Sequence, residues 1–251
     1  MKRQNDIPAK GHAIVMGATS GIGREVALLL AQKGWLVAIA GRRTEMLEKL
    51  RQCHKNIKVC RTVDVNTEAA PQTLREMAEE LGGIELYVHS SGIGWQNAEL
   101  DLEKELLTAN TNAVGFTRMV ANAFNMMAEN GKRGHIACIT SIAGTKGLGA
   151  APAYSATKRY QAHYLECLAQ LAHIRRLNIT ITDIRPGFVD TPLIEGSDFP
   201  MKLSVKAVAK DIVSAIEKRK SIRIIDWRYR LMVWIWRMIP RSIWTRIRIG
   251  G

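Results

Sequence analysis

Residues 12–23 read HAIVMGATSGIG, a short apolar run followed by three glycines in the spacing GxxxGxG. Together with the apolar-periodic stretch at 26–30, this pattern predicts a strand, a glycine-rich turn and a helix in succession. Glycines at such a junction let the backbone approach a pyrophosphate, which the free amides of the helix N-terminus then bind. Glycine-rich loops without a ligand are common, but this position at the first strand–helix junction favours dinucleotide binding. The candidate contacts are Gly17, Thr19, Ser20, Gly21, Ile22 and Gly23.

The alternation of apolar runs and helical stretches continues along the chain. Further strands are predicted at 36–40, 58–63, 86–89, 135–140 and 179–184, and helices at 45–50, 67–81, 106–130 and 155–174. Strands that alternate with helices pair in parallel through right-handed crossovers, and unbroken apolar runs indicate burial on both faces of the sheet. The predicted fold is therefore α/β: a Rossmann-like doubly wound parallel sheet in three α/β/α layers, forming a single domain with a C-terminal basic amphipathic extension.

Composition narrows the class of protein. A chain of 251 residues that is 47% hydrophobic and 24% charged is ordinary for a globular protein, which excludes a disordered, collagen-like or disulfide-stapled chain. The four cysteines have no CxxC spacing and no cluster of His, Asp and Cys occurs, so we expect no metal site. The polar stretch at 1–10 lacks the apolar core of a signal peptide, so we expect a cytoplasmic protein, with peripheral membrane contact as the open alternative.

Two arginines follow the second predicted strand. In this fold an acidic residue near that point bonds the ribose hydroxyls of NAD, but here the chain has Arg42 and Arg43. A planar, permanently charged guanidinium suits the 2′-phosphate of NADP. The alternative is a solvated pair of arginines at a helix entrance. NADP(H) is therefore the preferred cofactor over NAD(H).

Three residues form a candidate catalytic set. Tyr154 and Lys158 are four residues apart, so a helix places both on one face, and Ser141 follows the fifth predicted strand. A phenol has a pKa of about 10, and a nearby ammonium lowers it enough for proton exchange with a carbonyl oxygen. A serine hydroxyl beside the phenol can hold the same oxygen. A lone YxxxK is normally an ordinary helix face, but the three residues after a nucleotide-binding turn are a much sharper signal.

With these motifs in order, the sequence resembles the classical short-chain dehydrogenase/reductase family from about residue 12 to residue 193. The resemblance implies that Tyr154 exchanges a proton with the substrate oxygen, that Ser141 positions the carbonyl, and that Lys158 bonds the nicotinamide ribose and lowers the pKa of Tyr154. It further implies that Asn112 holds a relay water near Lys158. Asn110 competes for that role, and the Asn-x-x-Gly spacing favours Asn112, although either amide can simply lie inside a helix.

The resemblance also assigns cofactor contacts beyond the first turn. The segment PGFVDT at 186–191 resembles the part of the family that binds the nicotinamide carboxamide, and Asp64 and Val65 resemble its adenine contacts. A loop-capping role is the equal alternative for Asp64. The implied contacts outside the turn and the arginine pair are Asp64, Val65, Ser91, Gly92, Tyr154, Lys158, Pro186, Gly187, Val189 and Thr191.

Two positions depart from the family pattern. The chain has His89-Ser90-Ser91-Gly92 where relatives usually have Asn-Asn-Ala-Gly, and Met16 where a threonine usually precedes the first glycine. Strands one and four are neighbours in the expected order 3-2-1-4-5, so we expect the two changes to lie side by side. Our hypothesis is that one local hydrogen-bond network replaces another, that Gly92 keeps the cofactor path open, and that His89 is a packing residue.

The C-terminal segment has a composition of its own. Residues 218–251 carry ten basic residues, one acid and four of the six tryptophans, and so account for most of the net charge of +13. We predict an NADP-binding short-chain dehydrogenase/reductase domain at 1–217 and a basic, Trp-rich extension at 218–251, either part of the same domain or an appendage facing a membrane or a partner. The stretch WRYRLMVWIWRMI at 227–239 is too short to span a bilayer. It fits an interfacial helix, a wall of the substrate pocket, a subunit contact or a dock for an acidic carrier protein, and we expect no nucleic acid partner.

These expectations combine into an enzyme. The predicted activity is the NADPH-dependent reduction of a ketone or aldehyde carbonyl to an alcohol, with a lipophilic or 3-oxoacyl compound as the narrower substrate. The alternative is a nucleotide-binding, membrane-associated or scaffold protein that keeps the fold without turnover. By resemblance, a homodimer or homotetramer is expected.

Overall fold

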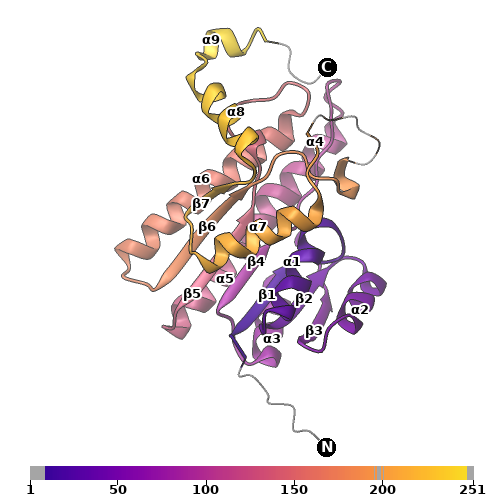
Figure 1. Ribbon diagram of the computed structural model, residues 1–251, viewed down its shortest axis with the longest axis vertical. Coiled ribbons are helices and arrows are strands. Elements are labelled where there is room, and N and C mark those ends of the chain that lie inside the picture. The colour runs from indigo at the N-terminus through magenta and orange to yellow at the C-terminus, as the bar shows by residue number, and fades with distance from the viewer. Residues whose placement is uncertain (1–8, 195, 197–198, 200, 248–251) are drawn as a thin grey trace, which may run out of the picture.

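One parallel sheet with helices on both faces organises the chain (Figure 1). The computed structural model describes residues 9–194, 196, 199 and 201–247. Within them the strand order is β3-β2-β1-β4-β5-β6-β7, and all neighbours pair in parallel. This confirms the predicted doubly wound α/β fold. The strands are β1 (His12–Met16), β2 (Leu36–Gly41), β3 (Ile57–Thr62), β4 (Leu86–His89), β5 (Gly134–Ile139), β6 (Ile179–Arg185) and β7 (Ile222–Ile224).

Alternate side chains of the central strands enter two separate cores. In β1, Ala13 and Val15 pack on one face of the sheet, whereas Ile14 and Met16 pack on the other, and all four are fully buried. The first face is covered by α1 (Gly21–Gln32), α2 (Thr44–Gln52) and α7 (Val205–Glu217), and the second by α3 (Ala70–Leu81), α5 (Phe116–Asn130) and α6 (Pro152–Ile174). Burial on both faces explains why the strands read as continuous apolar runs.

The predicted helix at 106–130 is interrupted in the structure. It consists of α4 (Leu102–Ala109), a π-helical segment at Asn110–Gly115 and α5. Single π-helical turns are rare and often lie at functional sites. Here the wider turn contains Asn112, one of the predicted site residues, and buries it completely.

The C-terminal part contains elements that the sequence did not predict. Helix α7 and the short strand β7 were both missed, and β7 pairs with β6 at the sheet edge. After β7 come α8 (Trp227–Met238) and α9 (Arg241–Trp244), which project beyond the sheet at the top of Figure 1. Among the described residues, no helix combines the length and the apolar composition needed to cross a membrane.

Candidate active site

A cavity of about 960 Å³ lies along the carboxyl ends of the central strands. Ligands of doubly wound folds bind at this edge, because the loops diverge there to opposite faces of the sheet. All but two of the predicted site residues line the cavity, and the exceptions are Gly23 and Asn112. The predicted residues that line it are Gly17, Thr19, Ser20, Gly21, Ile22, Arg42, Arg43, Asp64, Val65, Ser91, Gly92, Ser141, Tyr154, Lys158, Pro186, Gly187, Val189 and Thr191.

The glycines of the first turn are required by close backbone contacts. Gly17 has a φ of +87°, and a Cβ placed there would lie 2.6 Å from the backbone nitrogen of Ser91. A Cβ on Gly23 would lie 2.2 Å from the carbonyl oxygen of Gly17, so Gly23 shapes the turn from behind without lining the cavity. The turn is therefore a tight cradle at the N-terminus of α1, and its shape fits a pyrophosphate.

The two arginines lie at the rim of this cradle. The guanidinium of Arg43 donates hydrogen bonds to Oγ1 of Thr19 at 2.7 Å and to Oγ of Ser20 at 2.6 Å. Both Arg42 and Arg43 are exposed and line the cavity. Two exposed cations beside two hydroxyls form a donor-rich corner that is suited to a phosphate group.

The predicted adenine and nicotinamide contacts line the same cavity. Oδ1 of Asp64 accepts a hydrogen bond from the backbone N–H of Asn66 at 3.0 Å, so this carboxylate caps the loop and also borders the cavity. From the other side, Cγ2 of Thr191 comes within 3.2 Å of where a Cβ on Gly21 would be. The segment after β6 thus closes over the glycine-rich turn, although the two are far apart in sequence.

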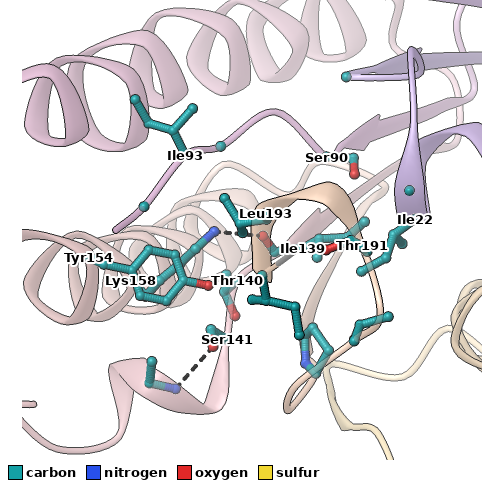
Figure 2. Close-up of a pocket in the computed structure, with 18 of the residues that line it drawn as sticks. Ile22, Ser90, Ile93, Ile139, Thr140, Ser141, Tyr154, Lys158, Thr191 and Leu193 are labelled. Atoms are coloured by element: carbon teal, nitrogen blue, oxygen red, sulfur yellow. Dashed lines mark hydrogen bonds between the residues drawn. The ribbon is translucent and has the colours of Figure 1, made fainter. Parts of the chain in front are cut away.

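The candidate catalytic residues converge from two elements. Ser141 follows β5, and its Oγ accepts a hydrogen bond from the backbone N–H of Ala143 at 3.1 Å. Tyr154 and Lys158 are one turn apart on α6, and Figure 2 shows the Tyr154 hydroxyl directed toward Ser141 with Lys158 beside the ring. Nζ of Lys158 lies 5.6 Å from the centroid of that ring. The structure therefore brings the three predicted residues together.

Lys158 is held by two acceptors inside the protein. Its Nζ donates to the carbonyl oxygen of Ile139 at 3.1 Å and to Oε1 of Gln161 at 3.0 Å. Because burial removes water from the ammonium, the pKa of Lys158 is lowered to about 8. The charges of Cys138 and Asp183 act in the opposite direction.

The pKa of Tyr154 is governed by burial. Burial raises it above its ordinary value, and the hydrogen bond from Ser141 only opposes this rise. Lys158 is not among the causes of this shift, so the lowering of the Tyr154 pKa by Lys158 stays a prediction. The ammonium of Lys158 lies beside the ring and directs its hydrogen bonds to Ile139 and Gln161.

Asn112 lies behind the cavity and fastens the loop after β4. Its Nδ2 donates to the carbonyl oxygen of Ile93 at 2.6 Å, and its Oδ1 accepts from the backbone N–H of Ile93 at 2.9 Å. Its own carbonyl oxygen accepts a 2.8 Å hydrogen bond from Nε2 of Gln161. The competing Asn110 is exposed. Gln161 thus joins Asn112 to Lys158, a link that sequence reasoning missed although Gln161 follows Lys158 by three residues, on the same helix face.

The two departures from the family pattern lie side by side, as expected. Met16 is the register partner of His89 on the neighbouring strand. His89 is buried, and its Nδ1 lies 2.9 Å from the hydroxyl oxygen of Tyr87. Its ring packs edge-on against that of Phe116, with the ring centroids 5.2 Å apart. Burial, and then the charge of Lys158, lower the pKa of His89 to about 3, so it is neutral. His89 is therefore part of the packing, as predicted.

The end of the cavity away from the glycine-rich turn is apolar, and side chains of α8 form part of its wall. Gly187 touches α8 so closely that a Cβ there would lie 2.2 Å from the ring of Tyr229, and the Tyr229 hydroxyl donates to the carbonyl oxygen of Met201 at 3.1 Å. A wall of the substrate pocket was one of the alternatives that the sequence left open for 227–239, and Met232 and Trp236 line the cavity here. The apolar residues around this end are Leu148, Phe188, Leu193, Ile194, Phe199, Met201, Met232 and Trp236.

Comparisons with known proteins place this site in a family. The family described as short chain dehydrogenase matches residues 11–198. An uncharacterized oxidoreductase of Myxococcus xanthus is 36% identical over 195 residues, covering 75% of this chain and 76% of its own. Dehydrogenase/reductase SDR family member 7B of Bos taurus is 27% identical, covering 90% of this chain and 77% of its own.

Two solved structures are similar over most of the chain. A variant of actinorhodin polyketide ketoreductase with NADPH has a TM-score of 0.74 and 26% identity, covering 86% of this chain and 95% of its own. The 3-ketoacyl-(acyl-carrier-protein) reductase from Brucella melitensis complexed with NADH has a TM-score of 0.78 at 22% identity, covering 87% and 97%, and supports the fold alone. With the family match over residues 11–198, these findings show that the chain is an oxidoreductase of the short-chain dehydrogenase/reductase family.

Proposed function

We propose that the protein reduces a ketone or aldehyde carbonyl to an alcohol with NADPH. The observation that carries this proposal is the convergence of Ser141, Tyr154 and Lys158 in one cavity with a glycine cradle at its other end. A nucleotide-binding scaffold without turnover would need none of the three side chains at that place.

In the proposed reaction the protein positions the carbonyl and supplies the proton. The hydroxyl of Ser141 donates a hydrogen bond to the carbonyl oxygen, and Tyr154 transfers its phenolic proton to that oxygen as negative charge develops. The nicotinamide, when bound, supplies the hydride to the carbonyl carbon. The raised pKa of Tyr154 keeps the phenol protonated at neutral pH, which suits the acid role in the direction of reduction.

The cofactor is proposed to be NADP(H) because of Arg42 and Arg43. Both are exposed at the rim of the cavity, and Arg43 is already oriented by Thr19 and Ser20. The related ketoreductase structure with NADPH is consistent with this choice. The carboxylate that would favour NAD by binding ribose hydroxyls is absent after β2, where Gly41 precedes the arginines.

The substrate is proposed to be lipophilic. Aromatic and methionine side chains surround the end of the cavity next to Tyr154, including Phe188 and Trp236. Such a lining favours a carbonyl compound with a large apolar part over a small polar one. A 3-oxoacyl thioester fits the same description. We also propose that the protein self-associates through the exposed apolar side chains of α4, among them Leu102 and Leu106.

Oxidation of NADPH, followed at 340 nm across aldehydes, ketones and 3-oxoacyl thioesters, tests the proposal. The Tyr154→Phe variant is expected to lose about 10²- to 10⁴-fold in kcat, the usual contribution of a positioned acid. Its affinity for NADPH, measured by fluorescence titration, should change little. Full turnover in this variant, or no turnover by the wild type on any of these classes while NADPH binds, would overturn the proposal.

A further inference from the structure

Helix α8 has two apolar faces, and only one of them packs against the protein. The inner face carries Tyr229, Met232, Val233 and Trp236, at the spacing i, i+3, i+4 and i+7. Tyr229 and Val233 are fully buried, and Met232 and Trp236 line the substrate cavity. This face accounts for the attachment of α8 to the domain.

The opposite face carries a second apolar row. Trp227, Leu231, Trp234 and Met238 follow the spacing i, i+4, i+7 and i+11, which aligns them along one side of the helix. Their exposed fractions are 50% to 64%, and no described part of the chain covers them. We call these four residues the outer stripe. Single exposed apolar residues are normal, but an aligned row that includes two tryptophans marks an interaction surface.

Unpaired arginines border the outer stripe. Arg230 and Arg237 lie two turns apart along its edge, and Arg241 and Arg246 follow on and after α9. All four are exposed, and none forms an ion pair with any residue that the structure describes. The one acid of this region, Asp226, is already paired with Arg228 at 2.9 Å. The surface is therefore apolar at its centre and cationic at its edge.

The helices that carry this surface are fixed to the loop after Ser141. Nε1 of Trp244 donates to the carbonyl oxygen of Gly147 at 2.7 Å, and Nζ of Lys146 donates to the carbonyl oxygen of Ile239 at 2.8 Å. The ring centroids of Trp236 and Trp244 are 5.2 Å apart. The outer stripe is thus held in a defined orientation on the projecting end of the molecule that Figure 1 shows.

We infer that α8 and α9 bind the protein peripherally to an anionic membrane surface, with the outer stripe among the lipid headgroups and upper acyl chains and the arginines on the phosphates. An interfacial helix combines tryptophan and leucine with flanking arginines, and anionic lipid adds the electrostatic attraction. An acidic protein would match the charge but leaves two exposed tryptophans without a function, so charge and apolarity together favour lipid.

The position of α8 between the membrane surface and the cavity gives a lipophilic substrate a route into the site. Met232 and Trp236 line the cavity from the inner face of the helix whose outer face meets the lipid. Leu193 and Met201 also line the cavity and are 46% and 40% exposed, so they mark an opening to the surroundings near this helix. If the proposed function holds, on which this step rests, a lipophilic carbonyl compound reaches the site from the membrane without crossing bulk water.

Flotation of the full chain with vesicles tests the docking directly. Vesicles of phosphatidylcholine with 30% phosphatidylglycerol, roughly an anionic cell membrane, are compared with phosphatidylcholine alone. The wild type is expected to float with the anionic vesicles and to be released by salt. The triple variant Trp227→Ser/Leu231→Ser/Trp234→Ser should bind at least about tenfold more weakly. The double variant Arg230→Gln/Arg237→Gln should lose about fivefold for each arginine.

Controls separate the docking from folding and from catalysis. The variant Leu171→Ser/Ile174→Ser removes exposed apolar side chains at the end of α6 and should float like the wild type. NADPH oxidation with a water-soluble ketone should be unchanged in the outer-stripe variant, so failure of the docking is distinguishable from failure of the proposed activity. Wild-type protein that stays with the soluble fraction, equal binding to both kinds of vesicle, or normal flotation of the triple variant would overturn the inference. Binding to an acidic carrier protein without vesicle binding would do the same.

Discussion

Nζ of Lys158 donates a 3.0 Å hydrogen bond to Oε1 of Gln161, whose amide nitrogen in turn donates to the carbonyl oxygen of Asn112 at 2.8 Å. All three residues are buried. The glutamine therefore makes a direct connection between Lys158 and the backbone of Asn112, and a relay water held by Asn112 stays a prediction. It also stabilises the charged form of a lysine that burial disfavours.

Replacing Gln161 should shift the pH dependence of the proposed reaction. Gln161→Leu removes an acceptor from the ammonium, so the pKa of Lys158 falls further below about 8. A hydrogen bond to a charged group contributes about 1.5–3 kcal/mol, which corresponds to a shift of about one unit or more. The alkaline limb of the kcat/KM profile should therefore move to lower pH.

Gln161→Glu provides the matched opposite change. A carboxylate in the same place raises the pKa of Lys158 and moves the alkaline limb to higher pH. If both variants show the wild-type profile, Gln161 has no part in the ionisation of Lys158.

Arg43→Ala should change the choice of cofactor. The guanidinium is exposed beside Thr19 and Ser20, where it is available to a 2′-phosphate. Loss of a charge-assisted contact corresponds to about tenfold or more in affinity for NADPH, with little effect on NADH. Fluorescence titration with both dinucleotides measures the ratio. Arg51→Ala, an exposed arginine on α2, is the control and should leave the ratio unchanged.

Gly94→Ala should impair turnover more than cofactor binding. A Cβ at this position would lie 2.2 Å from Cδ2 of Tyr154, so the ring has to move. A displacement of about 1 Å at a reacting group costs on the order of 10²-fold in rate. The comparison is Gly149→Ala, where a Cβ meets nothing within 4 Å. Equal kcat values for the two variants would show that the contact with Gly94 does not position Tyr154.

Acid should destabilise the protein through two buried histidines. Burial lowers the pKa of His89 to about 3 and that of His135 to about 4, whereas both titrate near 6.5 when the chain is unfolded. Between these values the unfolded state binds more protons, so stability is full above about pH 6.5 and is lost as the pH falls toward about 4. Each histidine contributes a slope of about 1.4 kcal/mol per pH unit in that window.

His89→Asn removes one of the two groups that take up a proton on unfolding. The free energy of unfolding of this variant should therefore depend less on pH in the acid range. Urea unfolding at pH 7.5 and pH 5 measures the change in free energy of unfolding between the two conditions. The variant is expected to show a smaller change than the wild type, even if its stability at pH 7.5 is lower. An equal change would mean that His89 is not protonated on unfolding in this range.

Local patterns in the sequence determined the fold class, and together with the family resemblance they named fewer than half of the residues that line the cavity. An apolar run before GxxxGxG, together with Tyr154 four residues before Lys158, specifies a strand–turn–helix and a shared helix face through backbone geometry alone. Each of these signals lies within a few residues, so it can be read without the rest of the chain. The positions of Gly17, Ser141, Tyr154 and Lys158 around one cavity followed from them.

Tertiary structure alone decided the contacts between distant segments. Strand β7 has only three residues and forms because β6 offers it a free edge, which no local pattern records. The pKa of Tyr154 depends on burial and on the hydrogen bond from Ser141. The contact between Gln161 and Asn112 depends on the π-helical turn that presents Asn112. The apolar stretch of α8 is one continuous run in sequence. In the helix its side chains divide between a face that lines the cavity and a face without a partner among the described residues. The division follows from the period of 3.6 residues, which places neighbours in sequence on different sides of the helix.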